Sequence, residues 1–229
     1  MSLKDYWYIA AESRELRAKP LARTMLGEPI VLFRDGAGKA AALQDRCAHR
    51  NVALSLGTVS AGRLQCCYHG WRYDNSGACV LAPAMGEGAE LPKGACVRAF
   101  PAEEQDGYVW VYMGEGAPAG RPYHFAHYGE PGWTSFTMQN RFEGSVEACL
   151  ENFLDSPHTV FVHKGWFRTS DPRPLSALVR RLKDSVEVRF ANEPISPSVV
   201  SRLLFPRGKE LEHVDRFLMP ATSKVDYSF

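Results

Sequence analysis

The chain lacks an excess of charge of either sign. It carries 27 Lys and Arg against 26 Asp and Glu, a formal net charge of +1. This balance supplies no broad positive field, so we expect neither nucleic acid nor a membrane as a partner. The sequence also lacks an apolar run near the roughly 18 residues that a membrane-spanning helix needs. Its N-terminus, MSLKDYWYIAAESREL, has no basic-then-apolar secretory signal, and we expect a cytoplasmic protein.

Internal repeats and low-complexity tracts are also missing. With 45% hydrophobic and 23% charged residues, the composition is that of a folded globular chain. A length of 229 residues fits one large domain or two small ones. In a reducing compartment, cysteines are expected to be metal ligands, catalytic thiols or small buried side chains, and not disulfides. The six cysteines are Cys47, Cys66, Cys67, Cys79, Cys96 and Cys149.

The N-terminal half predicts consecutive antiparallel strands. Apolar runs such as PIVLF, AAALQD and DGYVWVYM are separated by turn signals such as RDGAGK, Asn75-Ser76-Gly77 and Asp106-Gly107. Residues 114–122, GEGAPAGRP, then concentrate Gly, Pro and Ala without periodic apolar positions. We place a domain boundary there.

The sequence changes character after this boundary. From residue 143 to 155, apolar residues recur at helical spacing and acidic residues fall every fourth position, which predicts an amphipathic helix. Pro157 disfavours helical geometry at Ser156, so the helix is expected to end or kink there. Further on, SVEVRFA and HVDRFLM alternate as strands do.

Two cysteines and two histidines stand in two short segments at predicted turns. Cys47 and His49 form a Cys-x-His pair, and after a further sixteen residues Cys66 and His69 form a Cys-x-x-His pair. Closed zinc sites often use two cysteines and two histidines. A zinc finger, however, places both cysteines before both histidines, whereas each segment here has one of each. This alternation favours a two-iron cluster in which one iron takes the cysteines and the other the histidines, with zinc as the alternative.

The residues around these segments extend the pattern. CAHRNVALSLG followed by CCYHGWRYDNSG resembles the two-loop signature of the Rieske [2Fe-2S] domain, including the His-Gly-Trp after the last ligand. The resemblance implies that Cys47, His49, Cys66 and His69 bind the cluster. It also implies that Cys66, and not Cys67, is the second thiolate.

Three positions depart from the usual Rieske pattern, and none is a ligand. Ala48 and Cys67 stand where proline is common, and Asn51 stands where glycine is common. Because proline stiffens a loop, these departures predict altered shielding or potential of the cluster and not a loss of binding. The other cysteines lie in apolar contexts and are expected to be buried thiols: Cys79, Cys96 and Cys149.

A second metal-binding pattern follows the predicted helix, at Asp155-Ser-Pro-His158-Thr-Val-Phe-Val-His163. On an unbroken helix, at about 100° per residue, the two histidines would differ by about 140° and could not bind one ion. The break expected at Pro157 removes this obstacle. Two histidines supply the nitrogen half of a 2-His-1-carboxylate triad, which leaves positions open on non-haem Fe(II) for O2. Alone, a His-x4-His pair is more often a packing or surface feature.

Combined with the upstream loops, the segment from Glu151 to His163 resembles the catalytic motif of Rieske non-haem iron oxygenases, Glu-Asn-x-x-Asp-x-x-His-x4-His. The resemblance implies a mononuclear iron on His158 and His163. It also implies that Asp155 relays electrons between subunits of a homotrimer, by linking His69 of one protomer to His158 of the next. The alternative for Asp155 is a solvated position on the acidic stripe of the helix.

The third ligand of the triad, a carboxylate, is not found in this chain. The family supplies it from a helix well after the second histidine, and no such helix is predicted before Phe229. Four aspartates follow His163, and we assign the role to none: Asp171, Asp184, Asp215 and Asp226. The expected fold is α+β. Residues 1–115 are expected to form an all-β Rieske domain, and residues 116–229 part of a helix-grip catalytic domain with an antiparallel sheet, shortened at its C-terminus.

The resemblance implies the oxygenase component of a Rieske system. Electrons from NAD(P)H would pass through a separate reductase, with or without a ferredoxin, to the [2Fe-2S] cluster and on to the mononuclear Fe(II). O2 would then serve to hydroxylate, dihydroxylate or demethylate an organic substrate, with aromatic compounds favoured. Two hypotheses from other classes stay open: a Rieske electron-transfer protein whose C-terminal part is structural, and a zinc-binding interaction module.

Overall fold

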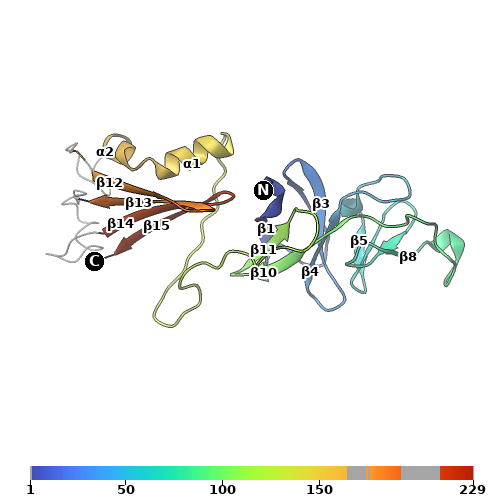
Figure 1. The fold of residues 1–229 in the computed structure, drawn as a ribbon. Coiled ribbons are helices and arrows are strands. Elements are labelled where there is room, and N and C mark those ends of the chain that lie inside the picture. The colour runs from blue at the N-terminus through green and yellow to red at the C-terminus, as the bar shows by residue number, and fades with distance from the viewer. Residues whose placement is uncertain (1, 164–173, 175, 192–211, 229) are drawn as a thin grey trace. The chain divides into compact units, whose positions relative to one another are not determined.

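The computed structural model describes residues 2–163, 174, 176–191 and 212–228 (Figure 1). The chain divides into two compact units, Met1–Thr137 and Met138–Phe229. The paired strands are antiparallel throughout the described residues, and both described α-helices lie in the second unit. The α+β class predicted from the sequence is confirmed.

The first unit consists of short strands and single 3-10 turns. Its three sheets have the strand orders β1-β11-β10, β2-β3-β4-β9 and β5-β6-β7-β8. The strands are β1 (Trp7–Glu12), β2 (Leu21–Met25), β3 (Glu28–Arg34), β4 (Ala40–Gln44), β5 (Thr58–Ser60), β6 (Arg63–Gln65), β7 (Arg72–Tyr73), β8 (Cys79–Leu81), β9 (Ala99–Phe100), β10 (Ala102–Gln105) and β11 (Tyr108–Tyr112). The 3-10 turns are η1 (Leu3–Asp5), η2 (Leu54–Leu56) and η3 (Pro83–Met85).

Strand β3 shows why PIVLF is apolar at consecutive positions. Successive side chains of a strand point to opposite faces. Val31 and Phe33 lie in one hydrophobic core, and Ile30 and Leu32 lie in the other. Because β3 is buried on both faces, it cannot show the polar alternation of a half-exposed strand. The core that contains Val31 and Phe33 also holds the two cysteine loops described below.

The turns lie where glycine and aspartate predicted them. Asp106 and Gly107, with φ of 53° and 81°, connect β10 to β11. Gly77 ends the Asn75-Ser76-Gly77 turn with φ of 82°, and a Cβ there would lie 2.1 Å from the carbonyl oxygen of Val97. Only glycine fits at this close approach of two chain segments.

Residues 114–137 form no helix or strand, yet they belong to the first unit. The buried carboxylate of Asp106 accepts the N–H of Phe125 over 2.7 Å and lies 2.9 Å from Nδ1 of His124. The ring of Phe125 also lies 5.9 Å from that of Tyr108 on β11. The first compact unit therefore extends past residue 115, because glycine and proline content predicts the loss of regular structure but not where the loop packs. A functional boundary at 115 stays a prediction.

In the second unit, the described strands form a four-stranded sheet with the order β12-β13-β14-β15. Helix α1 packs against β14 and β15, along one face of that sheet (Figure 1). The predicted strands SVEVRFA and HVDRFLM are confirmed as β13 and β14. The elements are α1 (Val146–Leu154), η4 (Ser156–His158), α2 (Thr159–Val162), β12 (Ser176–Arg181), β13 (Ser185–Ala191), β14 (Glu212–Leu218) and β15 (Thr222–Ser228).

Helix α1 ends where the sequence predicts and begins three residues after the start of the periodic run at residue 143. Ser145 is its N-cap, and the serine Oγ accepts the N–H of Ala148 over 3.2 Å. The helix ends at Leu154, and Pro157 lies in the following 3-10 turn, η4. Among the described residues, no helix is long and apolar enough to cross a membrane.

Candidate metal centres

The two cysteine loops are built alike. In each loop the cysteine N–H donates to the carbonyl of the residue five positions later, over 2.8 Å from Cys47 and 2.9 Å from Cys66. Each cysteine carbonyl accepts the N–H of the residue four positions later, which is Asn51 in the first loop and Gly70 in the second. Both residues have positive φ, 59° and 69°. Asparagine adopts this left-handed geometry more readily than most residues, which explains how it replaces the more common glycine.

These loops place the thiols inside and the imidazoles outside. Cys47 and Cys66 are each 2% exposed and lie in the same hydrophobic core. His49 and His69 are exposed, with ring centroids 4.6 Å apart. Cys67 is exposed, as expected when neighbouring residues point to opposite sides. The donors thus form one sulfur pair and one nitrogen pair.

The paired arrangement fits a two-iron cluster better than a single zinc ion. Two imidazoles on one ion, at about 2.1 Å for each metal–nitrogen bond, have ring centroids on the order of 5 Å apart. The 4.6 Å between His49 and His69 agrees with this value. A closed zinc site needs four donors around one point. Within the described part of the chain, no three His, Cys, Asp or Glu side chains converge in that way.

Two aromatic residues of the second loop and of β7 contact the first loop. The Tyr73 hydroxyl accepts the N–H of Ala48 over 3.1 Å and lies 3.2 Å from Sγ of Cys47. Since its oxygen already accepts a hydrogen bond, its own proton is free to be donated to the sulfur. Burial, and then the neighbouring Cys47, raise the pKa of Tyr73, so it stays a proton donor. Trp71 is 9% exposed and stacks on His49, with centroids 4.9 Å apart.

The protonation of the donors reflects this environment. Loss of solvation, and then the charge of His69, lower the pKa of His49 and favour the neutral imidazole that binds metals. Burial raises the pKa of Cys66, so a thiolate there needs a nearby cation for stability. Iron would supply that positive charge.

The second candidate site follows α1. His158 and His163 have ring centroids 5.4 Å apart, close to the spacing of two imidazoles on one ion. Nδ1 of His158 contacts the carbonyl oxygen of Asp155 and lies 3.7 Å from the Asp155 Oδ2. Nε2 of His158 is therefore the nitrogen available to a metal ion. The predicted break at Pro157 is confirmed, and it brings the two rings together.

No described aspartate completes a triad with these histidines. Asp171 lies outside the described residues. Asp215 is 3% exposed, and its Oδ1 lies 2.7 Å from Nε2 of the buried His213. Asp226 lies 3.0 Å from Lys224 and also pairs with an arginine, and the Asp184 carbonyl accepts a backbone N–H over 3.0 Å.

The expectation of buried thiols holds for one of three cysteines. Cys79 is buried, as expected. The expectation is wrong for Cys96, which is exposed, because its neighbour Val97 takes the inward position of this extended segment. Cys149 is partly exposed and borders the cavity described below.

Comparison with known proteins identifies the domain and its relatives. Residues 6–101 match the Rieske [2Fe-2S] domain. The chain is 31% identical over 185 residues to the iron–sulfur subunit of a toluene-4-sulfonate monooxygenase system from Comamonas testosteroni, a match that covers 79% of this chain and 52% of the relative. It is 37% identical over 164 residues to the oxygenase component of dicamba O-demethylase from Stenotrophomonas maltophilia, over 71% of this chain and 48% of the relative. The chain therefore contains a Rieske [2Fe-2S] domain and is related to the oxygenase components of Rieske systems.

Solved Rieske oxygenases share the fold of this chain. The crystal structure of dicamba monooxygenase bound to dicamba matches with a TM-score of 0.81 and 27% identity, over 99% of this chain and 68% of that one. Another structure of dicamba monooxygenase contains non-haem iron and dicamba. The Rieske oxygenase family therefore carries a [2Fe-2S] cluster and a mononuclear iron. The present chain spans about half the length of the two relatives, at 52% and 48%.

One contact of the Rieske domain could not be predicted from the sequence. The Tyr-Asp-x-x-Gly motif predicts a turn, but nothing in it identifies Tyr73 as the partner of Cys47, 26 residues earlier. The contact arises because Tyr73 on β7 pairs with Leu64 on β6 and enters the same core as Cys47.

Proposed function

We propose that this chain acts as the oxygenase component of a Rieske non-haem iron system that hydroxylates, dihydroxylates or demethylates an organic substrate, with aromatic compounds favoured. The observation that carries the proposal is the presence of two donor sets in one chain. In the first unit, two buried cysteines share one core and two exposed histidine rings lie 4.6 Å apart, and after α1 two further histidine rings lie 5.4 Å apart. Relatives named as monooxygenase and demethylase components support it.

In this proposal Cys47 and Cys66 bind the inner iron of the cluster, and His49 and His69 bind the outer one. When bound, the cluster passes single electrons, and an iron on His158 and His163 activates O2 for transfer to the substrate. The chain contributes a dry sulfur side, closed by the 2% exposure of both thiols. It also contributes an exposed imidazole side, where His49 and His69 are open to a protein partner.

Asp155 is proposed to orient His158 and to connect two subunits. Its carbonyl contacts Nδ1 of His158, which fixes the ring with Nε2 toward the metal position. Its side chain is 54% exposed, and His69 is exposed as well. Both can therefore reach a neighbouring protomer, as a relay from His69 of one subunit to His158 of the next requires. We propose a homotrimer on this basis.

The electron donors proposed are an NAD(P)H-dependent reductase and, in some arrangements, a ferredoxin. The exposed imidazole pair, beside the 62% exposed ring of Tyr68, offers such a partner a short path to the outer iron. We place the chain in the cytoplasm, since a reducing compartment keeps free thiols available to bind iron.

The competing function is a Rieske electron carrier with no mononuclear iron. Metal analysis separates the two, because the oxygenase needs about three irons for every two acid-labile sulfides, whereas the carrier needs about one iron for each sulfide. We expect the higher ratio in the purified chain. His158→Ala should lower it to that of the cluster alone, with an unchanged visible spectrum.

His127→Ala is the matched control, because His127 is a half-exposed histidine that pairs with Glu130 over 2.9 Å and stacks on Trp133, outside both pairs of metal-binding histidines. It should leave both iron and sulfide unchanged. An unmutated chain with one iron for each sulfide would favour the carrier. Colourless protein that contains zinc and no sulfide would contradict both functions.

A further inference from the structure

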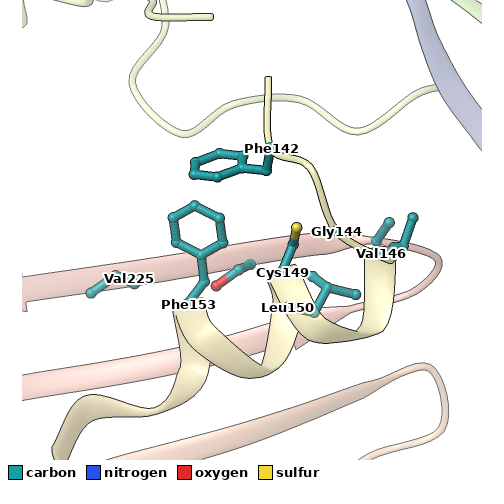
Figure 2. A pocket seen from close by; sticks show the side chains of 9 residues that line it. Phe142, Gly144, Val146, Cys149, Leu150, Phe153 and Val225 are labelled. Carbon is teal, nitrogen blue, oxygen red and sulfur yellow. The ribbon is translucent and has the colours of Figure 1, made fainter. Parts of the chain in front are cut away.

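A cavity of about 500 Å³ lies between α1 and the β14–β15 hairpin, and neither candidate metal centre includes its lining (Figure 2). Val146, Leu150 and Phe153 line it from α1, and Val225 lines it from β15. Phe142 stands over Phe153 at its edge, with ring centroids 5.8 Å apart and nearly perpendicular planes. The volume falls within the range of small-molecule sites and is large enough for a substituted aromatic ring.

The lining of this cavity contains no charged side chain. A carboxylate or sulfonate that entered it would lose water without gaining a cation, which is costly. An uncharged ring, in contrast, gains from contact with the aromatic and branched apolar side chains. The cavity thus discriminates against anions.

One polar atom marks a specific point in the lining. Among the residues that the structure describes, Oγ of Ser223 is the buried side-chain polar atom left without a hydrogen-bond partner. Ser223 lies on β15, on the same face as Val225, and lines the cavity. A buried hydroxyl without a partner is unfavourable, so a ligand that offers one neutral donor or acceptor group would be stabilised here. Rotation about a single bond, χ1, can aim this hydroxyl at such a group.

We propose that this cavity binds an uncharged aromatic molecule carrying one neutral hydrogen-bonding substituent, which Ser223 recognises. The proposal deepens the proposed function and rests on it for calling the ligand a substrate. Phe153 is on α1, five residues before His158. One wall of the cavity therefore belongs to the helix that directly precedes the proposed iron ligands. The lining disfavours ligands that carry a sulfonate or a carboxylate group.

The test compares three ligands of similar size in ligand-detected NMR titrations of the whole chain: p-cresol, p-xylene and 4-methylbenzoate. We expect p-cresol to bind at least about tenfold more tightly than the benzoate at pH 7, since the anion gains no partner. Ser223→Ala should weaken p-cresol about fivefold and leave p-xylene unchanged, because only the cresol hydroxyl loses a hydrogen bond. Equal binding of cresol and benzoate, or equal weakening of cresol and xylene, would overturn the proposal.

Two further variants locate the ligand. Ser228→Ala is the matched control, because Ser228 lies on the same strand, is exposed and does not line the cavity. It should change neither affinity. Val225→Trp fills the cavity and should weaken both neutral ligands more than about tenfold by steric exclusion. Leu150→Phe, a smaller filling change, serves if the tryptophan variant does not fold by circular dichroism. Unchanged binding in a folded filling variant would place the ligand elsewhere and refute the proposal.

The same samples separate this inference from the proposed function. Binding is measured without O2 or reductant, and iron and sulfide are determined alongside it. Cresol binding that depends on Ser223 in a chain without excess iron would sustain the cavity and contradict the oxygenase. Excess iron in a chain whose cresol binding is unchanged by Ser223→Ala would support the oxygenase and contradict the cavity proposal.

Discussion

The cysteine loops and the histidine segment hold their metal donors in different ways. Cys47 and Cys66 are buried in a hydrophobic core, and matched backbone hydrogen bonds close both of their loops. His163, in contrast, is exposed at the end of a four-residue helix whose Phe161 is 69% exposed. The first site is organised by packing, whereas the second depends on a few local contacts such as that of Asp155 with His158. A centre that only passes electrons gains from rigidity and exclusion of water, while a centre that admits O2 and substrate needs open positions.

The largest effect that we expect is the complete loss of the cluster in Cys66→Ser, because a buried hydroxyl cannot replace the second thiolate. Acid-labile sulfide and visible absorbance should both disappear. Cys67→Ser is the matched control, since Cys67 is the exposed neighbour, and it should retain both. If Cys67→Ser lost the cluster and Cys66→Ser kept it, the inner sulfur would be misassigned and the comparison of buried and exposed donors would fail.

The second unit has its own buried polar contact, and its removal should be the next largest effect. His213 and Asp215 are 1% and 3% exposed, and His213 stacks between Phe190 and Tyr227 on the flanking strands. Asp215→Ala removes this hydrogen-bond partner of the buried imidazole and should lower the free energy of unfolding by about 1–3 kcal/mol. Calorimetry would measure this loss.

A matched control exists on the same sheet. Asp226 pairs with Arg216 and Lys224 and is itself 38% exposed, so Asp226→Ala should cost about 1 kcal/mol or less. Equal costs for the two substitutions would mean that the buried His213–Asp215 contact stabilises the second unit no more than an exposed ion pair does.

The matched turns of the cysteine loops predict a smaller effect at Asn51. Because its φ is 59°, Asn51→Val should cost about 1–2 kcal/mol, since a β-branched side chain is strained in the left-handed region. Asn51→Gly should be close to neutral, because glycine adopts this backbone geometry without strain, as Gly70 does at the equivalent position of the second loop. The substitution removes the exposed contact of Asn51 with Arg46. Chemical denaturation would show both values. Equal costs for glycine and valine would mean that the side chain of Asn51, and not its backbone, holds the loop.

Several features of the fold could be predicted from the sequence because they depend on interactions between neighbouring residues. Gly77 and Asp106 marked turns, Pro157 marked the end of α1, and PIVLF marked a strand. Spacing also placed the four cluster candidates in two loops. These signals depend on neighbours within a few residues, which the sequence shows directly.

The rest depends on contacts between distant residues. Tyr73 reaches Cys47 across 26 positions, and Phe125 attaches an irregular segment to β11. Cys96 faces outward although its neighbours are apolar. Composition and periodicity do not encode which loop packs on which strand, so these features could not be predicted without the structure.

Tyr73 tests how the first unit tunes its metal centre. In Tyr73→Phe the sulfur of Cys47 loses the hydroxyl 3.2 Å away, and with it a donor that stabilises the more negative, reduced cluster. We expect the reduction potential to fall by about 40 mV for each 1 kcal/mol of lost stabilisation. Protein-film voltammetry would measure the shift, with Tyr68→Phe as the control because that ring is exposed beside His69. A potential that rises or does not move would show that the hydroxyl does not donate to the sulfur.

The smallest effect that we expect is the acid dependence from Glu104. Its carboxylate accepts two hydrogen bonds from the guanidinium of Arg34, one over 2.9 Å, and these lower its pKa below the ordinary value of 4.5. A lowered folded-state pKa gives stability that is present above the ordinary value and is lost as the pH falls through the folded-state value.

Glu104→Gln should therefore lower the free energy of unfolding at pH 7 by about 1 kcal/mol or less, because the pair is partly exposed, and the difference from the unmutated chain should vanish at acid pH. Urea titrations from pH 7 to about pH 3.5 would measure it. Glu187 in the second unit, whose pKa is lowered by Arg189 and Arg216, should show the same sign in Glu187→Gln. A difference that grows toward acid pH in either unit would contradict the assigned pairs. If this happened in only one unit, the two units would differ in their surface electrostatics as well as in how they hold their metal donors.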